Sequence, residues 1–185
     1  MSKIQCRCAW VNMKNPRYIQ YHDEEWGVPE HRDEKLYELL ILESFQAGLS
    51  WECVLNKREY FCEAFDGFCL DKICDYGEEK CAELMENSNI IRNRRKIEAT
   101  INNSRVFREI QKEFGTFDAY IWGFVEGKTV IEDYKVRTTS PLSDEISKDL
   151  RRRGMKFVGS TIIYSYLQAV GILNGHGGEC DLCGL

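Results

Sequence analysis

The sequence predicts one all-α domain, residues 1–185, and three observations support this. Apolar residues recur mainly at helical spacing, the spacing that brings side chains three or four positions apart onto one face. Only three prolines occur in 185 residues, and no repeat, low-complexity segment or obvious linker divides the chain. With 43% apolar and 30% charged residues, the chain has an ordinary globular composition and enough length to bury a core.

Three helices are expected in the first two thirds of the chain. Asp33 is a candidate N-cap for a helix over 33–47, which Gly48 would end. A short helix should follow over 78–87, and a longer one over 92–114. Each assignment rests on apolar periodicity together with a residue type that starts or stops helices.

The last third should hold two more helices. Ser143 is a candidate cap for the first, because acidic residues follow it and Gly154 is a plausible stop. The apolar segment 161–173 reads as a closing helix. Between these helices and the preceding ones, segment 124–139 should form a short strand or only a loop.

Cellular context can be judged from apolar runs. The first ten residues, MSKIQCRCAW, lack the apolar segment of a secretory signal, and no run approaches the length that crosses a bilayer. We therefore expect a cytoplasmic protein with no membrane partner. Because the cytosol keeps thiols reduced, the nine cysteines are not expected to form disulfides. Small buried hydrophobes are the simplest interpretation of five of them: Cys53, Cys62, Cys69, Cys74 and Cys81.

Charge is distributed unevenly. The net charge of −5 argues against a protein that coats nucleic acid by bulk electrostatics. However, RNRRK (92–96) and RRRGMK (151–156) together hold eight of the 25 basic residues. Such clusters suit localised phosphate contacts, although solvated helix ends would have the same composition.

One carboxylate interrupts an apolar helix face. Glu43 lies in the middle of a stripe formed by Leu36, Leu40 and Ala47, with Leu39 at its edge. A buried carboxylate is costly unless it is paired, hydrogen-bonded or protonated. A structural salt bridge would satisfy it; alternatively, it faces a pocket. The turn that follows presents Trp51 near the same helix end, which favours the pocket.

Aromatic residues gather upstream, in CAWVNMKNPRYIQYHDEEWG. They are Trp10, Tyr18, Tyr21 and Trp26. Aromatics at this density are most often core. Here, however, they alternate with His22 and three acidic residues, so a site wall is the other interpretation. Flat aromatic walls with a polar edge suit a planar ligand such as a nucleobase.

A helical hairpin is expected where ENSNIIRNRRKIEATI joins two helices. Asn89 tolerates the left-handed backbone that a tight turn needs, and backbone N–H groups at the start of the next helix can bind a phosphate. Helical hairpins are common, so the pattern alone is weak. If it binds DNA, the candidate contacts are Asn89, Ile90, Ile91, Arg92, Arg94, Arg95 and Lys96.

The tail NGHGGECDLC offers metal ligands that must find partners elsewhere. Structural zinc takes four Cys or His ligands, and the other two would come from the N-terminus. One possible set is Cys8, His22, His176 and Cys180; the other is Cys6, Cys8, Cys180 and Cys183. Spacing leaves both open, and either would tie the chain ends together.

Together, these segments resemble the DNA-3-methyladenine glycosylase I family. The resemblance runs from Cys8 to Cys180, through CAWV, YIQYHDEEWGVP, LESFQAGLSWECVLNKRE, IIRNRRKI, RRRGMKFVGSTIIYSYLQAVG and HGGEC. It implies a helix-hairpin-helix glycosylase fold of two helical lobes, with a zinc site joining the N- and C-terminal segments. It also implies that one structural Zn²⁺ is held by Cys8, His22, His176 and Cys180, which leaves Cys6 and Cys183 as extra thiols.

The resemblance also implies roles for the pocket residues. Glu43 matches the carboxylate that contacts the excised base, Trp51 the aromatic that stacks on it, and Tyr21 a hydroxyl that lines the pocket. Trp10, Tyr18 and Trp26 lie near these in the family pattern.

The chain departs from its relatives at two places. Ser44-Phe45 replaces a glycine and a glutamine that relatives often carry, so a bulkier pocket floor is expected. Asn89 and Arg95 replace hairpin glycines. Asn89 can keep the turn, whereas Arg95 adds charge.

The implied activity is release of 3-methyladenine from alkylated double-stranded DNA by a monomeric base-excision-repair enzyme. Methylation at N3 puts a positive charge on adenine, so the leaving group is already activated and base flipping with selective binding should suffice. Trp51 would attract the cationic base through its ring. An ionised Glu43 would accept from the exocyclic amine. No lysine is obviously placed for Schiff-base chemistry, so we expect a monofunctional enzyme that leaves an abasic site.

Two other classes of protein fit parts of the sequence. A non-catalytic damaged-DNA-binding module would bind DNA without releasing base. A metal or redox sensor would use the terminal cysteines. Neither needs a carboxylate at position 43 beside an aromatic cluster, which favours the enzyme.

Overall fold

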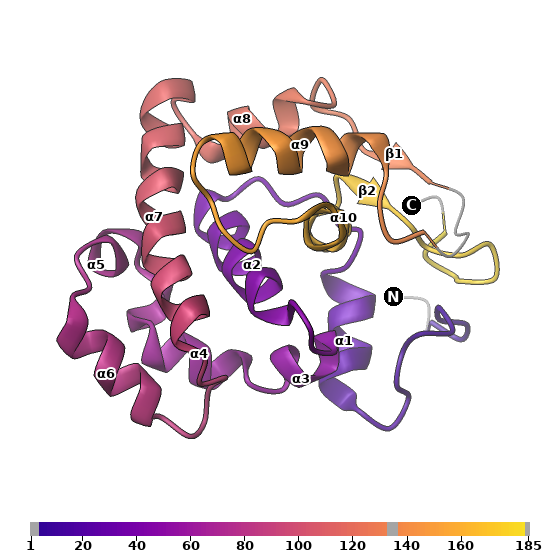
Figure 1. The fold of residues 1–185 in the computed structure, drawn as a ribbon. Helices are drawn as coiled ribbons and strands as arrows, with labels where there is room; N and C mark the ends of the chain where they lie inside the picture. Colours follow the sequence, from indigo (N-terminus) through magenta and orange to yellow (C-terminus); the bar gives the residue numbers. More distant parts are fainter. Residues whose placement is uncertain (1–3, 133–136, 184–185) are drawn as a thin grey trace.

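Helix α2 (Asp33–Gln46) runs through the middle of the structure, and every residue from Leu36 to Phe45 is buried. A helix that is covered on all sides in this way belongs to the interior of a domain. Helix α7 (Arg94–Phe114) and helix α10 (Ser160–Ala169) both contact it, and they lie on either side of it in Figure 1. The computed structural model describes residues 4–132 and 137–183, and over these it is mostly helical, as predicted.

The remaining elements are short and surround this centre (Figure 1). They are α1 (Pro16–Glu24), α3 (Trp51–Leu55), α4 (Arg58–Ala64), the 3-10 helix η1 (Asp66–Phe68), α5 (Leu70–Cys74), α6 (Glu78–Glu86), α8 (Phe117–Gly123), β1 (Val130–Ile131), α9 (Pro141–Arg152) and β2 (Leu173–Asn174). In the described part of the chain, no helix has the length and apolar character required to span a bilayer.

The expected helices are present, but two of the predicted caps are wrong. Asp33 does begin α2, yet its carboxylate accepts hydrogen bonds from the backbone N–H groups of Phe117 and Asp118, both at 2.8 Å. It therefore pairs the first two backbone N–H groups of α8, whose N-cap is Thr116, instead of capping its own helix. Helix α9 is capped by Ser140, and Ser143 completes the reciprocal capping box from the third helical position.

The closing helix ends earlier than the apolar pattern predicts. Helix α10 stops at Ala169, and Gly171 has φ +72°, a conformation that favours glycine. A Cβ there would lie 2.3–2.4 Å from backbone atoms of Val28 and Pro29. The chain then runs into β2, which pairs in parallel with β1. The strand expected within 124–139 is thus β1; residues 133–136 lie outside the described part of the chain.

The two ends of the chain lie on the same side of the molecule (Figure 1). The Asp181 carboxylate accepts hydrogen bonds from the backbone N–H groups of Gln5, at 2.6 Å, and Cys6, at 3.1 Å. The Asp181 N–H in turn donates to the Cys6 carbonyl at 3.1 Å. This contact brings the cysteine-containing segments from both ends of the sequence together.

Candidate functional site

A cavity of about 230 Å³ lies between the α1–α3 region and α10. It brings together all six residues that the sequence analysis placed in a base pocket: Trp10, Tyr18, Tyr21, Trp26, Glu43 and Trp51. Its other lining residues are Gln46, Glu132, Arg137, Tyr164, Ser165, Gln168 and Gly175. The aromatic cluster upstream of α2 is therefore the wall of a site as well as part of the core.

Glu43 faces this cavity from the last turn of α2. Its side chain is 2% exposed, and its Oε2 atom has no hydrogen-bond partner among the described residues. Burial raises the pKa of Glu43 well above its usual range. Burial thus favours the protonated form of this carboxyl, whereas an ionised carboxylate was expected from the sequence.

Two further buried polar atoms share this property. Gln46 Oε1 and Trp51 Nε1 also lack a hydrogen-bond partner within the described part of the chain, and both residues line the same cavity. Buried polar groups in folded proteins are nearly always paired, so three such atoms around one cavity indicate a ligand that pairs them. An amide oxygen, a carboxyl group and an indole N–H would suit a planar ligand that carries both donors and acceptors.

Trp51 is positioned by a well-formed helix start. Ser50 caps α3, accepting from the Cys53 N–H at 3.2 Å. The Asn15 side-chain amide joins this helix to α1 by donating to Glu52 Oε1 at 2.8 Å. Tyr21, on α1, packs against the indole with ring centroids 5.2 Å apart. Burial raises the pKa of Tyr21 well above its usual range, so its hydroxyl remains a possible donor.

The wall that α10 contributes was not predicted from the sequence. Tyr164, Ser165 and Gln168 lie on this helix and line the cavity. Gly175 allows the chain to pass close to them, since a Cβ there would lie 2.6 Å from Gln168 Nε2. Ser165 and Gln168 are polar residues in a predominantly apolar helix, and these polar positions were the signal in the sequence that α10 contributes to the cavity.

Neither of the substituted residues after Glu43 lines the pocket. Ser44 is buried, and its hydroxyl donates to the Leu40 carbonyl at 2.9 Å. Phe45 is fully buried, with its ring centroid 4.6 Å from that of Phe61. The expectation of a bulkier pocket floor is therefore wrong, because both side chains lie away from the cavity.

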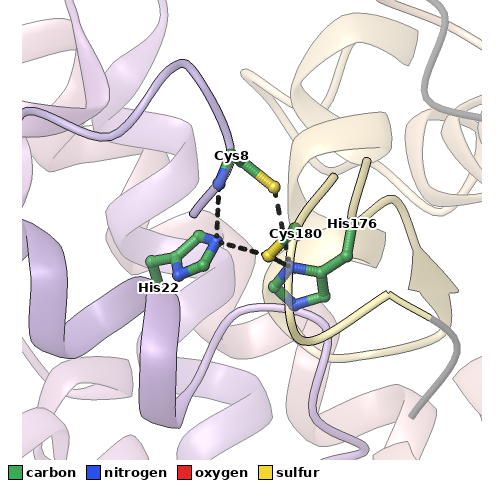
Figure 2. A group of neighbouring side chains, drawn as sticks. All are labelled: Cys8, His22, His176 and Cys180. Atoms are coloured by element: carbon green, nitrogen blue, oxygen red, sulfur yellow. Dashed lines mark hydrogen bonds between the residues drawn. The ribbon is translucent and has the colours of Figure 1, made fainter. Parts of the chain in front are cut away.

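Four ligand-type side chains meet where the chain ends come together. Cys8, His22, His176 and Cys180 are all buried, and their ligand atoms lie within 4.8 Å of one another (Figure 2). Of the two sets that spacing left open, the structure forms this one as a cluster that could hold a metal. Cys6 and Cys183 are exposed.

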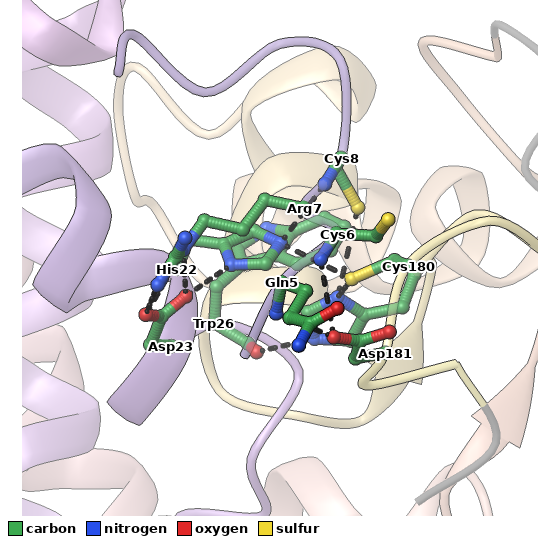
Figure 3. A network of polar contacts seen from close by, with 10 residues as sticks. Gln5, Cys6, Arg7, Cys8, His22, Asp23, Trp26, Cys180 and Asp181 are labelled. Carbon is green, nitrogen blue, oxygen red and sulfur yellow. Dashed lines mark hydrogen bonds and ion pairs between the residues drawn. The ribbon is translucent and has the colours of Figure 1, made fainter. Parts of the chain in front are cut away.

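A second layer of hydrogen bonds orients the two imidazoles (Figure 3). His22 Nδ1 lies 2.8 Å from the Asp23 carboxylate, which also accepts from Nε and Nη2 of Arg7. His176 Nε2 lies 3.0 Å from the Trp26 carbonyl. Each ring therefore turns its other nitrogen toward the cysteines, the arrangement that metal-binding histidines usually show.

The hairpin between α6 and α7 exposes part of the predicted basic cluster. Asn93 caps α7, and Arg92 and Arg95 are exposed. Arg94 is exposed too, but it pairs with Glu78 and with Glu98. Ile90 is buried and Ile91 is half-buried.

Two hairpin expectations need correction. Asn89 does not have a positive φ; instead its N–H donates to the Asn87 side chain at 3.0 Å, which shapes the turn without a left-handed residue. Lys96 is buried, and its amine donates to the carbonyls of Phe45 and Ala47 at 2.7 and 2.6 Å. It closes the C-terminal end of α2 and does not present its charge to a phosphate.

Solved structures define the class of protein to which this fold and cavity belong. The chain superposes on a crystal structure of 3-methyladenine DNA glycosylase I with a TM-score of 0.92 and 43% identity, covering 96% of this chain and 99% of that one. A Staphylococcus aureus structure described as showing the basis of 3-methyladenine recognition gives a TM-score of 0.90 at 35% identity, with 95% of each chain covered. The fold is that of a DNA glycosylase.

Sequence comparison identifies the family. A model of the methyladenine glycosylase family matches residues 10–183. DNA-3-methyladenine glycosylase 1 of Escherichia coli (strain K12) is 42% identical over 174 residues, which is 92% of each chain. DNA-3-methyladenine glycosylase of Haemophilus influenzae is 39% identical over 178 residues, 94% of this chain and 96% of that one. The chain belongs to the methyladenine glycosylase family, which confirms the resemblance found in its sequence.

Proposed function

We propose that this protein is a monofunctional DNA glycosylase that releases 3-methyladenine from alkylated double-stranded DNA and leaves an abasic site. The observation that carries the proposal is the aromatic cavity with three buried polar atoms, from Glu43, Gln46 and Trp51, that the described residues leave without a hydrogen-bond partner. The matching functions of the relatives support it. A flipped, planar base would supply hydrogen-bonding partners for those atoms and apolar faces for the aromatic rings.

Selectivity for the alkylated base would come from charge. Methylation at N3 makes the base in DNA cationic, and a cation beside Glu43 would favour loss of the carboxyl proton. The resulting pair of opposite charges in a buried pocket would stabilise the lesion, whereas neutral adenine would meet a protonated carboxyl. Trp51 would add stacking and attraction between its ring and the positive charge.

Little acid catalysis is needed, because the leaving base neutralises its own positive charge when the glycosyl bond breaks. None of the described residues that line the cavity is a lysine, so no amine is placed there to form a Schiff base. Strand cleavage should therefore not accompany base release. Nicked product on a gel before any alkali treatment would contradict the monofunctional mechanism.

We further propose that the four-residue cluster holds one structural Zn²⁺. Tetrahedral zinc with Zn–S of about 2.3 Å and Zn–N of about 2.0–2.1 Å would place sulfur and nitrogen about 3.6 Å apart. Three of the four sulfur–nitrogen pairs in the cluster are 3.4, 3.5 and 3.6 Å apart, so the residues fit the ion. Cys8 and His22 would join His176 and Cys180 through it, and bound zinc would supply folding free energy.

The metal would act on the pocket only through its surroundings. The Trp26 carbonyl lies 3.0 Å from His176 Nε2, and the Trp26 ring lines the cavity. Trp10 packs against both His22 and Trp26, with centroid separations of 5.3 and 4.8 Å. The cluster therefore supports the aromatic wall from behind, and none of its four residues lines the cavity.

Duplex DNA would be held by a monomer through the hairpin and its free cations. Arg92 and Arg95 are the exposed basic residues there that make no ion pair within the described part of the chain. Backbone N–H groups at the start of α7 would add phosphate contacts. With a net charge of −5, such contacts must be local.

Base release from methylated DNA tests the proposal. Purified protein is incubated with methylated duplex DNA, and the released bases are identified by chromatography. Free 3-methyladenine is expected, and its amount should fall in Glu43→Gln. Tight binding to methylated DNA with no base released would identify a damage-recognition module instead.

A further inference from the structure

A second carboxylate lines the base cavity, from a different wall. Glu132 directly follows β1, whereas Glu43 comes from α2; in Figure 1 these elements lie on different sides of α10. The Glu132 N–H donates to the Asn174 carbonyl at 3.0 Å, continuing the pairing of β1 with β2. Its Oε2 atom accepts a 2.6 Å hydrogen bond from the Tyr164 hydroxyl. Backbone and side chain are thus both fixed at the cavity.

The two carboxylates have contrasting surroundings. Glu43 is 2% exposed and its Oε2 has no hydrogen-bond partner among the described residues, whereas Glu132 is half-buried. Glu132 Oε1 accepts no hydrogen bond from the described residues, and Arg137, which lines the same cavity, forms no ion pair with it there. Glu132 is thus a half-buried side chain whose Oε1 is left unpaired by the described residues.

Tyr164 is suited to hold this carboxylate in place. It is buried on α10, and burial together with the bond to Glu132 raises the pKa of its hydroxyl. The hydroxyl therefore remains protonated and continues to donate. Since this bond occupies only Oε2, the other oxygen of Glu132 keeps its accepting capacity.

Enzymes that break glycosyl bonds often use two carboxyl groups whose environments differ. A flipped base would enter the cavity first, so its sugar would stay near the more exposed lining residues. Glu43 would then contact the base, and Glu132 would face the sugar carbon and the water that attacks it. The buried environment of Glu43 excludes water, as contact with the base requires, and the half-buried environment of Glu132 suits a group that must meet water.

We propose that Glu132 activates the attacking water, with Tyr164 as its positioning residue; this rests on the glycosylase function proposed above. The bond between sugar C1′ and base N9 breaks, and its electron pair leaves with the base, which becomes neutral 3-methyladenine. The water oxygen bonds to C1′ and its proton passes to Glu132, which then releases it to solvent. The abasic sugar keeps the hydroxyl. No other reactant is needed.

The test separates base binding from bond cleavage in the full-length protein. The excision rate is measured under single-turnover conditions, with enzyme in excess over methylated duplex DNA and at a concentration that saturates it. Binding of free 3-methyladenine is followed by tryptophan fluorescence, because three indoles line the cavity. We expect Glu132→Gln to slow excision by about 10²-fold, the lower range for loss of a general base, with unchanged affinity for the free base. Removing a negative charge should not weaken DNA binding, so saturation is still reached.

Further variants distinguish this role from a structural one. Glu132→Asp should recover part of the rate, and Tyr164→Phe should slow excision less than Glu132→Gln does. Glu145→Gln, at an exposed position on α9, is the matched control and should behave as wild type. Excision by Glu132→Gln at the wild-type rate would overturn the inference, as would parallel loss of excision and free-base binding. Failure of the glycosylase proposal is separately visible, since the wild-type protein would then release no base.

Discussion

Glu43→Gln should have a higher free energy of unfolding than wild type, by an amount that grows as the pH rises from 6 to 8. The side chain is buried and its carboxyl forms no ion pair with the described residues, so burial raises its pKa well above the usual range. Below about pH 4.3, the ordinary pKa of glutamate, folded and unfolded chains both hold the proton. Above it, only the unfolded chain releases the proton, so this residue lowers the free energy of unfolding as pH rises toward its folded-state pKa. Glutamine has the same shape and no proton to lose.

The expected magnitude follows from this one proton. A difference of one bound proton changes the free energy of unfolding by about 1.4 kcal/mol per pH unit. Between pH 6 and 8 the variant should therefore gain about 2.7 kcal/mol over wild type, provided that the folded carboxyl stays protonated across this range. All other titrating groups are shared, so they cancel in the difference between the two proteins.

Urea unfolding at several pH values measures this difference. Glu63→Gln is the matched control, since Glu63 is exposed on α4; its unfolding free energy should run parallel to that of wild type. If Glu43→Gln also runs parallel to wild type from pH 5 to 8, then Glu43 ionises normally in the folded protein. The description of the pocket as one that holds a neutral carboxyl would then be wrong.

The stacking wall, the metal cluster and the hairpin can each be tested by substitution. Trp51→Ala should weaken binding of free 3-methyladenine by about 1–3 kcal/mol, the value of one base–aromatic stack, as measured by titration calorimetry; unchanged affinity would exclude stacking. Cys180→Ser should lower the melting temperature strongly and the excision rate per folded molecule only slightly. A large rate loss in well-folded, zinc-free protein would show that the metal does more than stabilise the fold. Arg92→Ala should reduce the salt dependence of DNA binding by about 0.9 in the log–log slope. Lys96→Met should leave that slope unchanged but cost about 2–4 kcal/mol of stability in urea unfolding, because two charge-assisted bonds to carbonyls are lost; the opposite pattern would restore Lys96 as a phosphate contact.

The sequence predicted the features that local spacing controls. Glu43 stands out because Leu36 and Leu40 precede it at helical intervals, and the structure buries all three. The helical class and the extent of the long helices follow from the same periodicity. Caps were less predictable, because a cap needs only the right side chain at the right place in space. Asp33 has the right chemistry but accepts from the first backbone N–H groups of α8, far along the chain.

Features that depend on tertiary packing could not be read from spacing. Cys6 and Cys8 form a CxC pair and Cys180 and Cys183 a CxxC pair, which made a four-cysteine site as reasonable as the mixed one. Only the approach of α1 to the C-terminal segment decides between the two ligand sets. The contribution of α10 to the cavity depends on how this helix rotates against α2. Lys96 looks like its basic neighbours in sequence, yet it is turned inward by the carbonyl groups at the end of α2.

Stability and function make opposing demands on the same few residues. An unpaired buried polar group costs about 1–3 kcal/mol, and the cavity holds three such atoms. Without support, the free energy of the folded protein would fall if the aromatic walls closed over these atoms or if other groups paired with them. The cluster of Cys8, His22, His176 and Cys180 lies directly behind the wall formed by Trp10 and Trp26. Because it fixes both chain ends there, it can keep the cavity open without contributing an atom to it. The four ligand-type residues thus come from segments near the two chain ends, whereas Glu43, Gln46 and Trp51 come from α2 and α3 between them.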